Sequence, residues 1–353
     1  MFERGRALVI GVAGYADAAR LPDAVLNDAR DITSVLLSPD HCGFLPANVR
    51  TLTDGDATLA GLRMSLSDLA RSADLDDSVL LFFSGHGGRF AGDQTSFLLP
   101  IDFRADDPHG TVLMEEEFSE ALAAIPSRRL LVLIDACHAA GAGTFKSAGP
   151  QVALPGLSEK ALRTFAHGNG RVVIASSRTD ENSHVLPGAR NSVFTGKVLE
   201  ALTGASRTGS DGVVRVLDLF NYVAEHVNRT MNGLQHPVLR VHDLDDNFTV
   251  ASTGAGADIA REASHTPRDL EVLLPDLYPL GPTDRDIWLR AGGDLSLLNL
   301  NGTGKSNWFS ALRALRRGGG GRDIDRRALI ATALDDYPKH RELLALDVRG
   351  SNG

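Results

Sequence analysis

Short apolar runs recur through the first 250 residues, and most of them do not alternate with polar residues. A strand with one solvated face alternates apolar and polar side chains, whereas a strand covered on both faces of a parallel sheet is an unbroken apolar run. We therefore expect strands of a mainly parallel sheet over residues 7–12, 49–52, 78–83, 130–134, 171–176 and 236–241.

Helical periodicity fills the intervals between these runs. Apolar side chains recur three and four residues apart, first at Val25, Ala29, Ile32 and Leu36 and then at Leu59, Leu62, Leu66 and Leu69. Thr58 has the N-cap position of the second helix, where a hydroxyl group satisfies a free backbone amide. Further helices are predicted over residues 115–125, 158–166, 192–203 and 217–231. Strands that alternate with helices indicate an α/β fold with crossover helices on both faces of the sheet.

The pattern changes after residue 250, which divides the chain into two predicted domains. Residues 1–250 form the α/β domain, and small polar residues without periodicity over 251–267 are typical of a linker. Residues 268–353 contain no convincing strand. Their short amphipathic stretches, separated by Pro and Gly, predict a small helical bundle in which the glycine run 318–321 is a flexible loop.

Charge and cysteine content narrow the possible functions. The net charge of -9 argues against a nucleic-acid partner, because domains held by phosphate contacts are usually basic. The sequence has neither a signal-like N-terminal stretch nor an apolar run near the roughly 18 residues that span a bilayer, so we expect a cytoplasmic protein without membrane contact. Two cysteines, Cys42 and Cys137, cannot make a disulfide framework, and each is treated as a free thiol.

One of these cysteines directly follows a predicted buried strand, in the segment LLVLIDACH of residues 130–138. The predicted strand before it along the chain runs into SGHGG, which contains His86. Catalytic groups gather at the carboxyl ends of parallel strands, so His86 and Cys137 are expected at the same edge of the sheet. An imidazole can take the proton of a thiol and later protonate the leaving amine, while the amide of Gly87 can face a developing oxyanion. The pair predicts a cysteine nucleophile with a histidine base.

Either residue alone has a plain structural role, since free cysteines are commonly buried and a histidine at a strand end is commonly a satisfied polar group. Their separation of 51 residues, however, matches the arrangement of caspases. Residues 1–250 resemble the caspase-like cysteine peptidases of the metacaspase and orthocaspase branch, in the segments ALVIGVAGY, LPDAVLNDARDITSVL, SVLLFFSGHGG, LLVLIDACHAAGAG and RVVIASSRTDENS. The resemblance implies a six-stranded sheet of caspase type, a dyad of His86 and Cys137, and an oxyanion hole made by the amides of Gly87 and Cys137.

The residue two positions before the cysteine bears on specificity. Caspases that cut after aspartate typically have Gln there, and this chain has Asp135. A buried carboxylate selects Lys or Arg before the scissile bond, because an acidic side chain would meet like-charge repulsion. The resemblance adds Asp28 and Ser84 to the same pocket, and we expect cleavage after Arg, with Lys second. The alternative is that Asp135 only caps a helix or hydrogen-bonds a loop.

The resemblance also implies that the chain can be cut after the cysteine. The corresponding loop of the family can be cleaved into a large and a small subunit, which makes Lys146, Lys160 and Arg163 candidate self-cleavage positions. No cofactor is expected. Some metacaspases need calcium, and the acidic clusters 74–77 and 243–246 are candidate ligands, although solvated acidic turns account for both clusters as well.

Two features of the C-terminal helices complete the prediction. The segment NLNGTGKSNW, residues 299–308, looks like a phosphate-binding loop but has Asn299 in place of the first glycine, so we predict a helix start with Ser306 as its N-cap. Residues 268–346 resemble the helical effector-associated domains of bacterial conflict-system proteins. This resemblance implies recruitment by a partner that carries a similar domain, which raises the local concentration of the enzyme.

The sequence thus predicts an endopeptidase directed at Arg or Lys and recruited through its C-terminal helices, in a bacterial defence or cell-death system. Two alternatives stay open. The chain is an adaptor whose dyad is idle, or it is an α/β hydrolase of another type. The second alternative lacks a competing nucleophile motif such as GxSxG.

Overall fold

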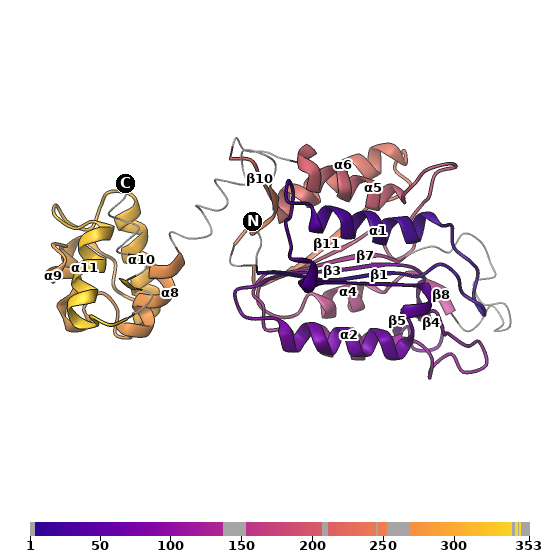
Figure 1. The fold of residues 1–353 in the computed structure, drawn as a ribbon, viewed down its shortest axis with the longest axis horizontal. Helices are drawn as coiled ribbons and strands as arrows, with labels where there is room; N and C mark the ends of the chain where they lie inside the picture. Colours follow the sequence, from indigo (N-terminus) through magenta and orange to yellow (C-terminus); the bar gives the residue numbers. More distant parts are fainter. Residues whose placement is uncertain are drawn as a thin grey trace. The chain divides into compact units, whose positions relative to one another are not determined.

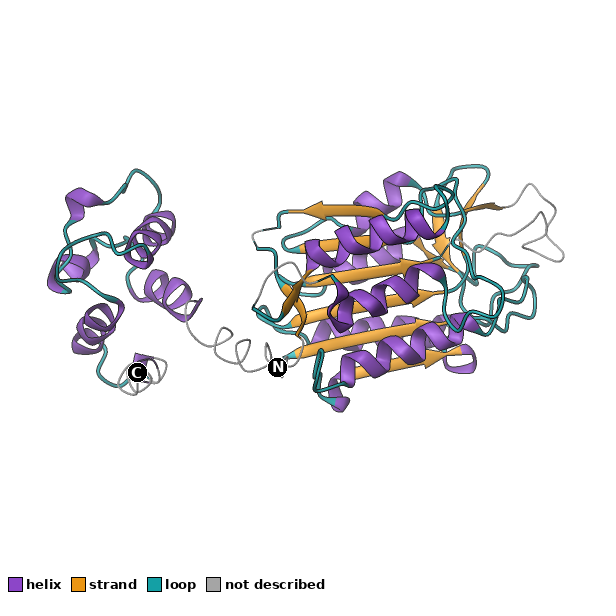
Figure 2. Cartoon of the chain, turned by 90° about the horizontal axis from the view of Figure 1, so that it is seen from above, coloured by secondary structure: helices purple, strands orange, loops and turns teal. Residues whose placement is uncertain are grey.

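The computed structural model describes residues 4–136, 153–206, 211–244, 246–252, 268–340, 343, 344 and 346 (Figures 1 and 2). The chain divides into two compact units, Met1–Ala260 and Arg261–Gly353. None of the helices in the described part of the chain is long and apolar enough to cross a membrane.

The first unit is built on a six-stranded sheet with the strand order β11-β9-β7-β3-β1-β2. Neighbouring strands are parallel except for β11, which runs antiparallel to β9. The strands are β1 (Gly5–Gly11), β2 (Val49–Thr53), β3 (Ser78–Ser84), β7 (Leu130–Asp135), β9 (Arg171–Ala175) and β11 (Val238–His242). Each run predicted as a strand is one of these six, so the mostly parallel α/β sheet is confirmed.

Helices cover both faces of this sheet, as Figure 1 shows. One face carries α1 (Ala24–Leu37), α5 (Val193–Glu200) and α6 (Val216–Thr230), and the other carries α2 (Leu59–Ser72), α3 (Glu115–Ala123) and α4 (Glu159–Phe165). Successive strand residues point to opposite faces. In β1, accordingly, Leu8 and Ile10 belong to the core on the α2 side, whereas Ala7 and Val9 belong to the core on the α1 side.

Two smaller antiparallel sheets extend the first unit. One has the order β6-β5-β4-β8 and contains β4 (Gly87–Phe90), β5 (Ser96–Leu98), β6 (Leu113–Met114) and β8 (Ala153–Pro155); the other pairs β10 (Val213–Arg215) with β12 (Thr249–Ser252). No apolar run predicts these strands, because each has only two to four residues. The first of the two sheets positions the candidate site, since β4 begins one residue after His86.

The second unit consists of short helices around an aromatic core. Its helices are α8 (Arg268–Leu277), α9 (Ile287–Arg290), α10 (Gly304–Arg316) and α11 (Arg326–Asp336), joined by the 3-10 turns Asp284–Asp286 and Leu295–Leu297. The buried indole of Trp308 donates to the carbonyl oxygen of Tyr278 at 2.9 Å, so the largest side chains of this core also satisfy backbone groups.

Two local predictions for this unit are wrong. Thr303 rather than Ser306 caps α10, because the Thr303 hydroxyl accepts a hydrogen bond from the Ser306 amide. The glycine run 318–321 is a packed turn rather than a flexible loop, since the carbonyl oxygen of Gly320 accepts hydrogen bonds from the Trp288 indole at 2.9 Å and from the Asp294 amide at 2.7 Å. A Cβ on Gly320 would lie 2.7 Å from the Trp288 ring, which explains a glycine at this point of contact.

Candidate active site

The candidate site lies where the central strands β3 and β7 end. Their parallel register pairs Ser84 with Asp135, and the amide of Gly85 donates to the carbonyl oxygen of Asp135 at 3.2 Å. The segments that follow Ser84 and Asp135 therefore leave the sheet at the same edge. His86 follows Ser84 by two residues, and Cys137 follows Asp135 by two residues but lies outside the described residues.

The first residue of β4 packs against the chain that leads into the cysteine. A Cβ on Gly87 would lie 2.8 Å from the carbonyl oxygen and 2.9 Å from the Cβ of Ala136. Those distances are shorter than ordinary van der Waals contact, so a larger residue would push the two segments apart. The described chain therefore brings His86 and Gly87 next to the residue that directly precedes Cys137.

The His86 side chain is held from the loop between β1 and α1. It is 2% exposed, and its Nε2 lies 2.7 Å from the carbonyl oxygen of Ala19. Because a carbonyl oxygen only accepts hydrogen bonds, Nε2 carries the proton and the lone pair of the neutral ring is on Nδ1. The Tyr15 ring packs on the imidazole with centroids 4.9 Å apart.

Tyr15 makes a second connection to His86 through the backbone. Its hydroxyl accepts from the His86 amide at 3.0 Å and donates to the carbonyl oxygen of Leu99 at 3.2 Å. Asp54 fixes the start of the same loop, because its Oδ1 accepts from the amides of Ala13 at 2.8 Å and Gly14 at 3.0 Å. The sequence did not indicate these roles, although Tyr15 closes the matched segment ALVIGVAGY.

Two fully buried carboxylates, Asp28 on α1 and Asp135 at the end of β7, lie beside the histidine turn. The Ser84 hydroxyl donates to Asp28 Oδ2 at 3.1 Å. Ser192 joins the two acids, since its amide donates to Asp28 Oδ1 at 3.0 Å and its hydroxyl donates to Asp135 Oδ2 at 2.5 Å. The three residues predicted for the pocket, Asp28, Ser84 and Asp135, are thus brought together.

Asp135 also accepts from the hydroxyl groups of Ser183 at 2.6 Å and Thr195 at 3.1 Å. Ser192 at the same time caps α5 by accepting from the Thr195 amide at 2.9 Å. Asp135 therefore does hold the loop before α5, as the structural alternative predicted. The sequence contains no signal for these hydroxyl groups, because serines and threonines are ordinary at a helix start.

The surroundings of Asp28 change its protonation. Burial, together with the charge of Asp135, raises the pKa of Asp28 to about 8, and hydrogen bonds from Ser192, Asn191 and Ser84 only partly oppose this shift. Like charges in a site of low dielectric constant do not ionise together easily. Near neutral pH Asp28 therefore keeps its proton.

Two of the three candidate self-cleavage residues lie in a helix. Lys160 and Arg163 belong to α4, which Ser158 caps by accepting from the Ala161 amide at 3.0 Å. Lys160 is also 3.8 Å from Glu115. Lys146 lies outside the described residues.

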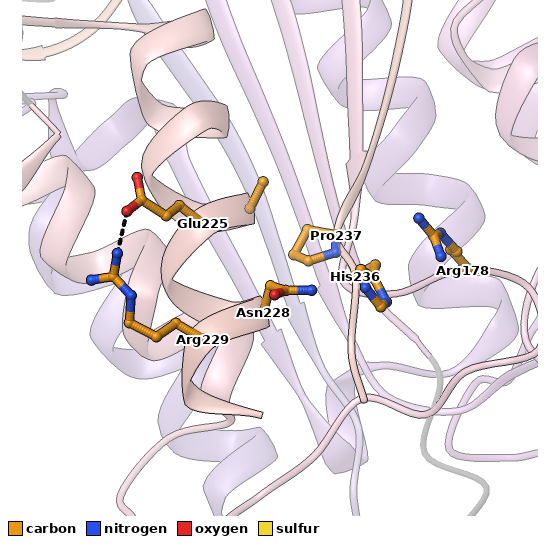
Figure 3. A pocket seen from close by; sticks show the side chains of 7 residues that line it. Arg178, Glu225, Asn228, Arg229, His236 and Pro237 are labelled. Atoms are coloured by element: carbon orange, nitrogen blue, oxygen red, sulfur yellow. Dashed lines mark hydrogen bonds and ion pairs between the residues drawn. The ribbon is translucent and has the colours of Figure 1, made fainter. Parts of the chain in front are cut away.

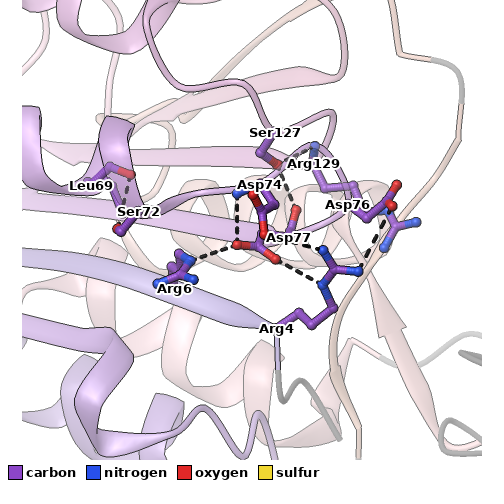
Figure 4. Close-up of polar contacts among 9 residues, drawn as sticks. All are labelled: Arg4, Arg6, Leu69, Ser72, Asp74, Asp76, Asp77, Ser127 and Arg129. Atoms are coloured by element: carbon purple, nitrogen blue, oxygen red, sulfur yellow. Dashed lines mark hydrogen bonds and ion pairs between the residues drawn. The ribbon is translucent and has the colours of Figure 1, made fainter.

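The acidic cluster 74–77 directly precedes β3, at the end of that strand opposite to Ser84. Figure 4 shows Asp74, Asp76 and Asp77 beside Arg4 and Arg6. The buried Asp77 carboxylate accepts from Arg4 Nε at 3.1 Å, Arg6 Nε at 2.6 Å and the Asp74 amide at 3.0 Å. Burial raises the pKa of Asp77, but these hydrogen bonds outweigh burial and lower it. The oxygens of Asp77 are thus used by Arg4, Arg6 and the backbone. Within the described ranges, no three side chains of His, Cys, Asp or Glu form a group that could hold a metal ion.

A hollow of ≈ 580 Å³ lies between α6 and the start of β11 (Figure 3). Its lining includes Arg178, Asn228, Arg229 and His236. Gln235, the residue before His236, connects this hollow with the acid pair. Its side chain donates to the Ser183 hydroxyl at 3.3 Å, and that hydroxyl donates to Asp135.

The first unit is similar in sequence to a known family of proteins. The family model described as Caspase domain (Peptidase_C14) matches residues 4–249. Metacaspase-1 of Eremothecium gossypii is 31% identical over 152 residues, which cover 39% of this chain and 32% of that protein. Metacaspase-4 of Arabidopsis thaliana is 28% identical over 150 residues, which cover 38% of this chain and 34% of that protein. The match thus spans about a third of the length of these relatives. The crystal structure of the Drosophila initiator caspase Dronc covers 70% of this chain and 82% of its own, with a TM-score of 0.43 and 12% identity.

Proposed function

The chain belongs to the caspase-domain family of peptidases, and on that premise we propose that it is a cysteine endopeptidase that cleaves proteins after Arg or Lys. One observation supports this proposal above the others. His86 and Gly87 meet the chain just before Cys137, beside a pair of buried carboxylates.

In this proposal His86 and Cys137 are the catalytic dyad. The Ala19 carbonyl keeps the proton on Nε2, so Nδ1 takes the thiol proton of Cys137 and the thiolate attacks the scissile carbonyl carbon. The amides of Gly87 and Cys137 stabilise the resulting oxyanion. Nδ1 then gives its proton to the leaving amine, and water later hydrolyses the acyl-enzyme thioester.

Asp28 and Asp135 are the proposed specificity residues. A guanidinium or ammonium group that replaces the proton of Asp28 would make charge-assisted hydrogen bonds with both carboxylates, whereas a substrate aspartate would bring a further negative charge next to Asp135. Both acids are fully buried, so neighbouring residues have to shift before a substrate side chain reaches them. Ser84 and the hydroxyl groups that donate to Asp135 orient the pair.

The same specificity makes Lys146, Lys160 and Arg163 candidate positions for self-cleavage. A peptidase binds its substrate in an extended conformation, so Lys160 and Arg163 would have to leave helix α4 first. Cutting at either of these two residues therefore carries the cost of unfolding that helix.

The C-terminal helices are the proposed recruitment module. Resemblance to effector-associated domains favours a cytoplasmic partner that carries a similar domain and gathers copies of the enzyme in a bacterial defence or cell-death system. Recruitment raises local concentration and so activates an enzyme without a new contact at its active site. The proposal includes no resident metal or cofactor.

A panel of fluorogenic peptides that differ only in Arg, Lys or Asp before the scissile bond tests this proposal. The full chain should be assayed with and without fusion to a ligand-induced dimerisation module, because an unrecruited peptidase can be silent. We expect cleavage of the Arg peptide, weaker cleavage of the Lys peptide and none of the Asp peptide. Cys137→Ala should abolish activity, and Asp135→Asn should lower kcat/KM for the Arg peptide by about tenfold or more.

Asp77→Asn is the matched control, because Asp77 is also a buried aspartate next to β3 but lies at the opposite end of the strand. It should weaken folding and leave the ratio of Arg to Lys cleavage unchanged. A dimerised wild-type chain that cleaves none of the peptides would favour an idle adaptor, and preferential cleavage after Asp would contradict the proposed pocket.

A further inference from the structure

Arg89 lies on β4, three residues after His86. Side chains alternate along a strand, so Arg89 shares a face with Gly87. That face of Gly87 packs on Ala136. The Arg89 side chain therefore lies on the face of β4 that packs against the chain leading to Cys137.

The contacts of Arg89 are incomplete. Its side chain is 14% exposed, and one terminal nitrogen donates to Asp180 Oδ1 at 3.0 Å. Its Nε is buried and, among the described residues, has no hydrogen-bond partner. A guanidinium can bind a carboxylate through two parallel hydrogen bonds, and Asp180 fills only one of them. Asp180 itself is 88% exposed, so it gives up little when it returns to water.

The segment that carries Asp180 also builds the acid pair. Ser183, three residues further on, donates to Asp135 at 2.6 Å. Just before Asp180, the carbonyl oxygen of Thr179 lies so close to Gly156 that it leaves no room for a Cβ there, which places this segment against the residue that follows β8. A short stretch of chain thus connects the guanidinium of Arg89 with the carboxylate of Asp135.

We propose that Arg89 is a second substrate subsite, which takes an acidic side chain within two residues of the Arg or Lys at the cleavage point. The substrate carboxylate displaces Asp180 and binds the Arg89 fork through Nε and a terminal nitrogen. The preferred substrate then carries a basic and an acidic side chain close together. This inference rests on the proposed peptidase function.

Pairs of Arg peptides test the subsite. Each pair has Glu or its neutral isostere Gln at one of the two positions on either side of the Arg, and kcat/KM is measured for the dimerised full chain. At one of these positions, kcat/KM for the Glu peptide should be about tenfold higher than for the Gln peptide, because Gln cannot form the bidentate ion pair with the Arg89 guanidinium. Arg89→Gln should reduce that ratio to about one. Asp180→Asn should increase it, because the internal competitor becomes neutral.

The alternative is that Arg89 and Asp180 are only a latch that holds the segment. In that case both variants lower kcat/KM for the Glu and Gln peptides by the same factor, and the subsite is overturned. A wild-type enzyme that cleaves Arg peptides without any Glu preference overturns it too, while the peptidase proposal survives. If Arg89→Gln does not fold, Asp180→Asn decides alone, since the subsite requires a larger Glu preference.

A wild-type chain that cleaves no peptide contradicts the proposed function instead. Binding of the same Glu and Gln peptides to Cys137→Ala, measured by fluorescence anisotropy, then tests the subsite without catalysis. Tighter binding of the Glu peptide supports the subsite, and equal or undetectable binding overturns it.

Discussion

The hydroxyl group of Tyr15 accepts a hydrogen bond from the backbone amide of His86 at 3.0 Å, while the Tyr15 ring packs on the His86 imidazole. The same hydroxyl donates to the carbonyl oxygen of Leu99. One side chain thus fixes both the backbone and the ring of the proposed base. Since Asp54 in turn holds the Ala13 and Gly14 amides, the geometry of His86 depends on residues from three separate loops.

Tyr15→Phe should lower both stability and turnover. The change leaves the His86 amide and the Leu99 carbonyl without their buried partner, which costs about 1–3 kcal/mol of unfolding free energy. A loosened base should lower kcat more than it raises KM, because it acts on the chemical step. Urea unfolding and the kinetics of Arg-peptide cleavage measure the two effects.

Tyr222→Phe is the matched control, since the Tyr222 hydroxyl donates to the exposed Glu200 at 2.8 Å and lies on helix α6 rather than in a loop that holds His86. This variant should be close to wild type in both measurements. Equal losses of kcat in the two variants would show that Tyr15 does not position His86.

Asp28→Asn should remove a pH-dependent term from stability. Burial and the neighbouring Asp135 raise the pKa of Asp28 from 3.8 to about 8. The folded chain therefore keeps a proton that the unfolded chain has released, so stability from this group is complete below about pH 4 and is lost as pH rises to about 8. In urea titrations, the unfolding free energy of Asp28→Asn minus that of wild type should therefore increase as pH rises from about 4 to about 8.

Asp31→Asn, one helical turn away, should show the opposite sign. Hydrogen bonds from Arg190 lower the pKa of Asp31, so its carboxylate stabilises the fold above the unfolded pKa and the benefit disappears as pH falls. The unfolding free energy that Asp31→Asn loses relative to wild type should therefore become smaller as pH falls. Parallel pH trends for the two variants would contradict the raised pKa of Asp28.

The large sheet could be predicted because its inner strands β1, β3, β7 and β9 are apolar runs that are covered on both faces. The strand Gly87–Phe90 could not, because two of its four residues are glycines and its pairing depends on contacts distant in sequence. The prediction of a flexible loop at the glycine run 318–321 was wrong for a related reason. Flexibility was expected from composition, but the Trp288 indole and the Asp294 amide bind its backbone.

Only those residues of the candidate site that belong to recognisable motifs could be predicted from the sequence. Asp28, Ser84 and Asp135 belong to segments that resemble a family, and they do lie together. Ser192 looks like an ordinary helix cap in the sequence, yet its amide and hydroxyl connect both acids. Nothing in the order of residues shows that a cap also faces two buried carboxylates, because that depends on where α5 packs.

Gly87→Ala should inactivate the enzyme. An alanine Cβ would lie 2.8 Å from the Ala136 carbonyl oxygen and force β4 away from the chain that leads to Cys137. A displacement of even 1 Å at a reacting group can cost about 100-fold in rate, so we expect at least that loss in kcat/KM for the Arg peptide.

Gly196→Ala controls for the added methyl group, since a Cβ at that helical position has no heavy atom within 4 Å. It should keep full activity and gain roughly 0.5–1 kcal/mol of stability, because alanine is the better helix former. Retained activity in Gly87→Ala would remove the support that close packing at Ala136 gives to the proposed dyad.

Intrinsic fluorescence should report on the C-terminal unit alone. Both tryptophans of the chain, Trp288 and Trp308, are buried in the core of that unit, and this core shares no residue with the cores around the sheet. Leu329→Ala leaves both indoles in place but deletes a fully buried side chain from α11, which costs about 2–5 kcal/mol.

The midpoint of the urea transition followed by tryptophan emission should therefore fall in Leu329→Ala. Leu62→Ala, the same deletion of a fully buried leucine in the core around the sheet, should leave that midpoint unchanged and shift the far-ultraviolet transition instead. Each unit can lose stability separately only if its core is held by its own contacts. A fluorescence midpoint that moves equally in both variants would show that the two units unfold as one cooperative block.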